Sequence, residues 1–202
     1  MSTSKNKLAV AIGFGLSITV FFAIVAAFSF LDLWQLKLSD RLFKNFNPSE
    51  DIIIVRIDDK TINPINGLGE VPRWSRANYA QALENLNKYG PRVVAFDIFF
   101  AGPREQDGDK KFIEVLAETS NPILALIVKN SEAMNLQEIE LPYETFSKVK
   151  NVSLASVYTL PDKDSIVRNY LPQINDKTTQ STYDSLAFAA VKSFLPSSVE
   201  SL

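Results

Sequence analysis

The feature that most constrains this chain is an uncharged apolar run of 24 residues, Leu8–Leu31, near its amino terminus. As an α-helix this run would be roughly 36 Å long, enough to cross a hydrocarbon core of about 30 Å with some tilt. Trp34 follows the run, at a position where an aromatic side chain favours the membrane interface. The sequence therefore predicts a transmembrane helix over residues 8–31, preceded by a short tail over residues 1–7.

The charges that flank the run leave its orientation almost balanced. Lys5 and Lys7 precede it, and Lys37, Arg41 and Lys44 follow it. A short tail is easily retained in the cytoplasm, which weakly favours an amino terminus inside and a domain outside. A cleaved signal peptide ending near residues 25–27, which would release a secreted binding protein, is the alternative. The run is longer than the usual apolar region of such peptides, about 7–15 residues.

Small residues recur at every fourth position of the predicted membrane helix. They are Ala11, Gly15, Thr19, Ala23 and Ala27. A ridge of this kind lets two helix backbones approach closely, so it predicts a homodimer through the membrane helix. Small residues are also common in membrane helices that do not pair, and both interpretations stay open.

The composition excludes several kinds of chemistry. The chain has no cysteine and no histidine, which rules out disulfides, thiolate or imidazole metal ligands and a Ser-His-Asp triad. All 23 acidic residues follow the apolar run, whereas two of the 21 basic residues precede it. The part after the run is therefore net negative, which argues against a nucleic-acid-binding face.

Hydrophobic spacing organises the rest of the chain. Residues 32–50 show helical spacing up to Pro48 and predict an amphipathic stalk helix. Residues 51–202 predict one α/β domain with a mainly parallel sheet. The predicted strands cover residues 51–57, 92–96, 122–128, 151–157 and 166–174. The predicted helices begin after Ser75, at a cap formed by Asp107 or Asp109, near Pro142 and at Tyr183.

Carboxylates follow the first two predicted strands. Asp58 and Asp59 end the first, and Asp97 ends the second. Because the carboxyl ends of parallel strands meet at one edge, we expect these side chains to converge, with Arg73 and Arg76 nearby. They would bind a divalent cation, act as acid and base in a hydrolase, or serve as caps and ion pairs that hold the long loop.

The other candidate motifs give little evidence for a functional site. The acidic segment Glu105–Asp109 lacks the spacing of a calcium loop, and we expect a solvated turn and helix cap there. The sequence has no Walker motif, no Gly-x-Ser-x-Gly motif and no Asp-x-Asp motif after the first predicted strand.

Taken in order, several pieces of the chain resemble the type-two CHASE domain (CHASE2), the extracytoplasmic sensor module of bacterial receptors. Besides the membrane helix, the pieces are Leu38–Leu42, Ile53–Thr61, Trp74–Arg76, Val93–Phe99, Asp162–Arg168 and Ser185–Ala187. Two departures stand out. Arg73-Trp74-Ser75-Arg76 occupies the place where the family usually has Pro-Trp-Pro-Arg, and Ser165 stands where a glycine is common.

The resemblance implies a non-enzymatic sensor anchored in the cytoplasmic membrane, with its domain outside, and it resolves the balanced charge count in favour of an inside amino terminus. We expect a small-molecule or periplasmic stimulus, no cofactor, and an output activity in a region beyond Leu202 or in a partner. The predicted ligand-binding residues are Asp58, Asp59, Trp74, Arg76, Asp97 and Arg168. The alternative is a membrane-tethered, metal-dependent hydrolase that uses the same carboxylates.

Overall fold

The computed structural model describes residues 2–27, 32–42, 47–131 and 136–195. They divide into two compact units. The first comprises Met1–Val55 together with Asp162–Ile166, and the second comprises Arg56–Pro161 together with Val167–Leu202. The chain is a mixed α/β protein, as predicted.

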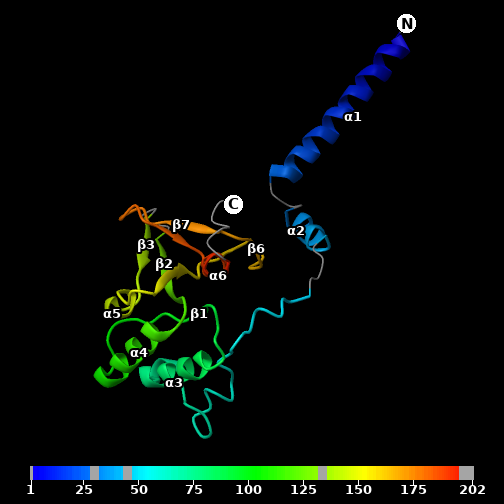
Figure 1. Cartoon of the computed structure of the whole chain (residues 1–202). Helices are drawn as coiled ribbons and strands as arrows, with labels where there is room; N and C mark the ends of the chain where they lie inside the picture. Colours follow the sequence, from blue (N-terminus) through cyan, green and yellow to red (C-terminus); the bar gives the residue numbers. More distant parts are fainter. Residues whose placement is uncertain (1, 28–31, 43–46, 132–135, 196–202) are drawn as a thin grey trace. The chain divides into compact units, whose positions relative to one another are not determined.

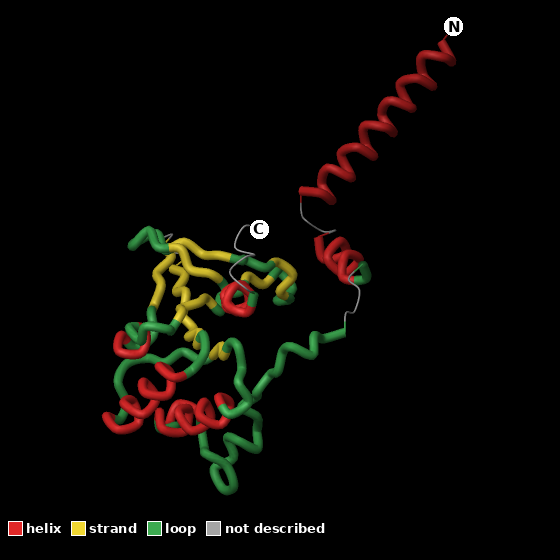
Figure 2. Tube along the Cα trace, viewed as in Figure 1, coloured by secondary structure: helices red, strands yellow, loops and turns green. Residues whose placement is uncertain are grey.

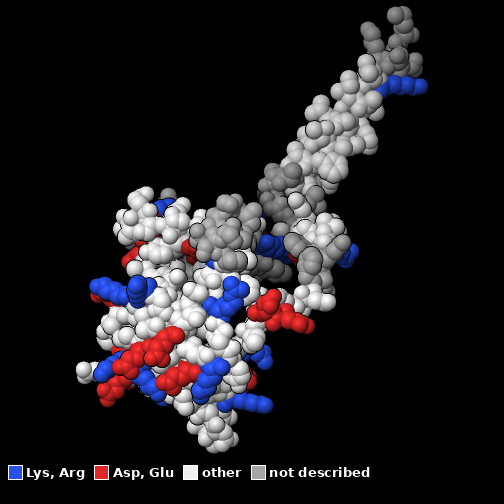
Figure 3. Space-filling view, in the orientation of Figure 1, with Lys and Arg blue, Asp and Glu red and all other residues white. Residues whose placement is uncertain are grey.

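The first unit begins with a long helix, α1, over Ser2–Ala27. Within it, Asn6–Val25 is long and apolar enough to cross a membrane, and none of that stretch is buried inside the protein. Ser17 and Thr19 donate to the carbonyls of Gly13 and Gly15, both at 2.9 Å, so neither hydroxyl is left unsatisfied in an apolar surrounding. Figure 3 shows a charged side chain on α1 only near its amino-terminal end. The end of the predicted span, residues 28–31, lies outside the described residues.

A short helix, α2, covers Asp32–Asp40 and is the first part of the predicted stalk. It closes in a turn in which the Leu42 amide donates to the Ser39 carbonyl at 2.9 Å. Of the rest of the predicted stalk over residues 32–50, residues 43–46 lie outside the described residues, and residues 47–50 form no helix.

The first predicted strand is wrong. Residues 51–57 form no strand, and Ile53 and Ile54 are 85% and 79% exposed. β-Branched residues favour a strand only where a neighbouring strand and a covering layer receive them, because β-propensity mostly measures such packing. The described residues supply neither to this segment.

A parallel sheet organises the second unit (Figures 1 and 2). Strand β1, Val94–Phe96, and strand β4, Ser153–Ser156, both pair in parallel with β2, Pro122–Ser131. Strand β3, Leu136–Glu140, runs antiparallel to the second half of β2. The predicted strands at 92–96, 122–128 and 151–157 and the mainly parallel sheet are confirmed, while β3 was not predicted.

Helices cover both faces of this sheet. Helices α3 (Arg76–Asn87), α4 (Gln106–Glu118) and α5 (Glu144–Ser147) share one buried cluster with Leu124 of β2. Helix α6 (Leu186–Phe194) packs against the preceding residue of β2, Ile123. Successive strand residues point to opposite faces, so Ile123 and Leu124 assign the two layers. The first layer is rich in aromatic contacts, among them Phe100–Phe112 with ring centroids 5.0 Å apart.

Two small hairpins precede α6. Strand β5 (Leu160–Pro161) pairs with β6 (Val167–Asn169), and β7 (Gln173–Asn175) pairs with β8 (Thr182–Asp184). The single strand predicted over 166–174 is therefore divided, with Pro172, which lacks an amide donor, lying between β6 and β7. Helix α6 starts after Ser185 rather than at Tyr183, because residues 182–184 are paired with β7.

Candidate functional site

The amino-terminal ends of α3 and α4 are joined by side chains from both helices. Ser75 caps α3, as predicted, by accepting a hydrogen bond from the Ala77 amide at 3.1 Å. The Glu105 carboxylate accepts from the Ser75 hydroxyl and from the Arg76 amide. Glu105 is the residue before α4, so a side chain from one helix start caps the other. The predicted caps of α4, Asp107 and Asp109, both lie inside its first turn instead.

A buried ion pair lies between the same two helices. Arg76 Nε is 3.7 Å from Asp109 Oδ1, and the two residues are 5% and 7% exposed. Among the described residues, neither of these two atoms has a hydrogen-bond partner. An unpaired polar atom in a low-dielectric interior costs free energy, so a small approach of the two helices would be favourable at this contact.

The other atoms of the pair are engaged. The guanidinium of Arg76 donates to the Ala101 carbonyl at 3.0 Å and lies over the Phe100 ring, 4.8 Å from its centroid. The second carboxylate oxygen of Asp109 accepts from the Arg104 amide at 2.8 Å. Burial lowers the pKa of Arg76 below its ordinary value and the Arg104 charge lowers it further, while Asp109 opposes both.

Arg104 completes this junction from the loop between β1 and α4. Its guanidinium donates to the Trp74 carbonyl at 2.6 Å, just ahead of α3. Loop, α3 and α4 are thus connected by charged groups at the side of the sheet where the parallel strand β1 ends. That side is where α/β folds most often bind ligands.

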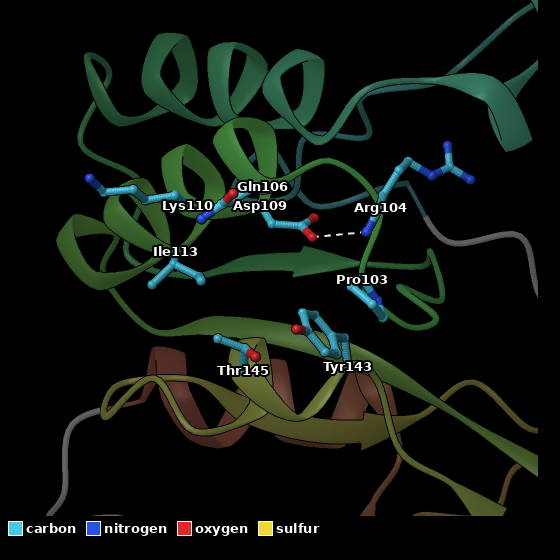
Figure 4. Close-up of a pocket in the computed structure, with 8 residues that line it drawn as sticks. All are labelled: Pro103, Arg104, Gln106, Asp109, Lys110, Ile113, Tyr143 and Thr145. Carbon is cyan, nitrogen blue, oxygen red and sulfur yellow. Dashed lines mark hydrogen bonds between the residues drawn. The ribbon is translucent and has the colours of Figure 1, made fainter.

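An open cavity of about 440 Å³ lies against α4 at this junction (Figure 4). It is lined by the loop residues Pro103 and Arg104, by Gln106, Asp109, Lys110 and Ile113 of α4, and by Tyr143 and Thr145 at α5. Figure 4 shows Ile113, Tyr143 and Thr145 facing one another across it, with the Asp109 carboxylate turned toward the Arg104 amide. Its wall combines apolar surface with hydroxyl, amide and charged groups, which is the usual make-up of a small-molecule site.

A second cavity, of about 490 Å³, lies within the loop that leads to α3. Its lining comes from Asp59–Arg73, a stretch that includes the short 3₁₀ helix η1 (Val71–Arg73). Of the residues predicted from the sequence, Asp59 lines this cavity. A charged pair on its rim, Arg73 Nε with Glu70 Oε2 at 3.7 Å, is highly exposed and contributes little to stability.

The predicted convergence of carboxylates is not seen. Asp58 is exposed and accepts from the hydroxyl and the amide of Thr61 at 2.8 and 3.0 Å, and these bonds lower its pKa, the hydroxyl most. Asp97 is also exposed. Within the part of the chain that the structure describes, no three acidic side chains form a group that could hold a metal ion. Asp58 therefore closes a local turn, because the strand expected to present it is not formed.

The remaining predicted residues take other positions. Trp74 is buried, and its indole donates to the Gly69 carbonyl at 2.8 Å, so it holds the loop onto α3. Arg76 is the buried partner of Asp109 described above. Arg168 is half-buried on β6 and is engaged in an interaction.

Sequence reasoning missed Asp109 and Glu105 by treating their segment as a solvated turn. Asp109 is buried, and Gly108 leaves room for the Glu105 side chain, which an added Cβ would meet. One signal was available: Asp109 precedes Phe112 and Leu116 by three and seven residues, which places it on the apolar face of α4.

Comparison with known proteins agrees with this architecture. A family model described as the CHASE2 domain matches residues 17–201. No curated protein and no solved structure matches the chain. CHASE2 domains are extracytoplasmic sensor domains and are not catalytic, which suits a chain with a candidate membrane helix ahead of an α/β domain. With nearly its whole length matched, the chain belongs to the CHASE2 domain family.

Proposed function

We propose that this chain is the sensing part of a membrane receptor, with α1 in the cytoplasmic membrane, its amino terminus inside, and the second unit outside. A ligand binds in the cavity against α4 and changes the packing of α3 and α4. The observation that carries this proposal is the Arg76–Asp109 pair, which has two unsatisfied buried atoms and whose Asp109 lines the cavity.

The separation of the Arg76–Asp109 pair is a quantity that a bound ligand could change. At 3.7 Å, Arg76 Nε and Asp109 Oδ1 attract each other but are too far apart for a hydrogen bond of about 2.9 Å. A ligand shifts an equilibrium only if it binds two conformations with different affinity. A ligand bound against α4 would do so if it held α4, and with it Asp109, at a different distance from Arg76 on α3.

This proposal gives different roles to the six ligand-binding residues that were predicted from the sequence. Arg76 acts through Asp109, which lines the α4 cavity, and Trp74 holds the loop that Arg104 contacts. Asp59 belongs to the second cavity, which we propose as a minor site at most. We assign Asp58, Asp97 and Arg168 no direct ligand contact.

The membrane helix extends the proposal to a dimer through the ridge Ala11, Gly15, Thr19, Ala23 and Ala27. The space around Gly15 is open, and the Thr19 hydroxyl is satisfied within its own helix, so this face can accept a second helix. Gly15→Ile is expected to weaken association in a membrane two-hybrid assay, whereas Gly13→Ile, off the ridge, leaves it unchanged. Equal effects of both changes would contradict a dimer along this ridge.

A cavity-filling variant tests the sensor function. The full chain in lipid nanodiscs is heated with amino acids, sugars, nucleotides or dicarboxylic acids at millimolar concentration. We expect at least one class to raise the unfolding temperature, and Thr145→Trp to abolish that shift. Thr178→Trp, an exposed change on the β7–β8 turn, is the matched control and should retain it. A shift that survives Thr145→Trp would place the ligand elsewhere, and no shift with any class would contradict binding of these compounds.

A further inference from the structure

We infer that the α4 cavity binds a small organic anion, a carboxylate carried by a short apolar or aromatic body. The inference rests on the proposed sensor function and names the chemical class of its ligand. It is carried by the lining of the cavity, which combines cations that have no carboxylate partner among the described residues with apolar surface and with hydroxyl groups. All of these groups belong to the second unit.

The charges that line the cavity are unevenly compensated. The acidic residue in the lining, Asp109, is buried beside Arg76 and also accepts from the Arg104 amide. Asp107, in the same first turn of α4, is exposed and does not line the cavity. Arg104 and Lys110 are exposed, and neither forms an ion pair within the part of the chain that the structure describes. The lining therefore presents positive charge that is complementary to an anionic ligand.

Both cations have donors to offer to a ligand. Among the described residues, the Lys110 ammonium has no hydrogen-bond partner. Arg104 uses Nη1 to donate to the Trp74 carbonyl at 2.6 Å, and because a guanidinium has several N–H groups, others remain for a ligand. Figure 4 shows the charged ends of both side chains extended outward on opposite sides of the cavity. Since both side chains are exposed, either end can turn toward the opening.

The rest of the lining suits an uncharged body next to the carboxylate. Pro103, Ile113 and the ring of Tyr143 supply apolar surface. The hydroxyls of Tyr143 and Thr145 have no partner among the described residues, so both can donate to a carboxylate oxygen. The volume of about 440 Å³ is that of a small-molecule site. These features fit an organic carboxylate better than a bare inorganic ion, which would leave the apolar surface uncovered.

An anion in this cavity would act on the pair formed by Arg76 and Asp109. Burial lowers the pKa of Arg76 most, and the Arg104 charge lowers it further, so the two guanidinium groups repel each other. A carboxylate bound to Arg104 would offset this repulsion and favour a closer approach of Arg76 to Asp109. The bound and free states would then differ in the packing of α3 against α4, which gives the ligand a different affinity for each.

Thermal unfolding of the full chain in lipid nanodiscs tests the ligand class. The probes are benzoate and phenylacetate, their neutral analogues benzamide and phenylacetamide, and inorganic phosphate, all at neutral pH. We expect only the two organic carboxylates to raise the unfolding temperature. Lys110→Gln should weaken their apparent affinity about tenfold, as expected for the loss of one hydrogen bond to a charged group. Lys111→Gln is the matched control, because Lys111 pairs with Glu84 and does not line the cavity, and it should leave the affinity unchanged.

The possible failures are distinguishable from a failure of the proposed function. Equal shifts with the amides or with phosphate would overturn the inference, and if Thr145→Trp abolishes those shifts the cavity is still a ligand site. Equal effects of Lys110→Gln and Lys111→Gln would also overturn it. A carboxylate shift that survives Thr145→Trp would contradict both the inference and the proposed site. The absence of any shift with the carboxylates would overturn the inference alone, because other classes of compound test the cavity independently.

Discussion

Acidic residues occur both in the loop that starts at Asp58 and in the junction between α3 and α4. In the loop they bond within their own turn, whereas in the junction they bond to distant parts of the chain. Asp58 satisfies its carboxylate with Thr61, three residues away. Glu105 caps a helix 29 residues away, and Asp109 pairs with Arg76 across two helices. A carboxylate bonded within its own turn stabilises only that turn, whereas a buried carboxylate that joins distant segments fixes how helices pack.

The largest expected effect is at the buried pair. Asp109→Ala would leave Arg76 buried without its counter-charge and should destabilise the domain by about 3 kcal/mol. Replacing both residues, as Arg76→Met with Asp109→Leu, should recover most of that loss, because no charge is then left buried. Urea unfolding followed by the fluorescence of buried Trp74, in a Trp34→Phe background, measures both. A double variant as unstable as the single one would show that the charges act separately.

Gly108→Ala, at the junction between α3 and α4, is expected to have an intermediate effect on the free energy of unfolding. In an exposed helix position this change stabilises by about 1 kcal/mol. Here the added Cβ would meet the Glu105 side chain and displace the cap of α3, so we expect a net loss of about 1 kcal/mol. The same unfolding assay reports it. Stabilisation by Gly108→Ala would mean that Glu105 is free to move and does not hold α3.

The smallest effect is expected at Asp58 and depends on pH. Its folded-state pKa lies below the ordinary value of 3.8, mainly through the Thr61 hydroxyl. Its contribution is therefore complete above pH 3.8 and is lost as the pH falls through the lower, folded-state pKa. Asp58→Asn should lower the unfolding temperature slightly at pH 7, and the difference from the unmodified chain should shrink below pH 3.8. A difference that grows on acidification would show that the carboxylate is not stabilised by this turn.

Several elements were predictable because their causes are local. The long apolar helix α1, a candidate membrane span, follows from the run 8–31, and α3 follows from Ser75 and the spacing of Tyr79 and Leu83. The parallel core strands followed from short apolar segments separated by helices. The segment 51–57 shows the limit of such reasoning, since its apolar residues match a strand and yet stay exposed.

The candidate site was less predictable, because its residues are defined by partners far away in sequence. Trp74 and Arg76 were predicted to bind a ligand at an exposed edge of the sheet, whereas both are buried. Asp109 was assigned to a solvated turn and helix cap, because its acidic segment Glu105–Asp109 lacks the spacing of a calcium loop.

The sequence by itself determined the long apolar helix that could span a membrane, the α/β class and the family, because length, uncharged composition and ordered motifs express these directly. Only the tertiary structure decided which carboxylates matter. Whether an aspartate is a local cap or a buried counter-ion depends on burial and on groups that folding brings beside it, as Arg76 is brought to Asp109.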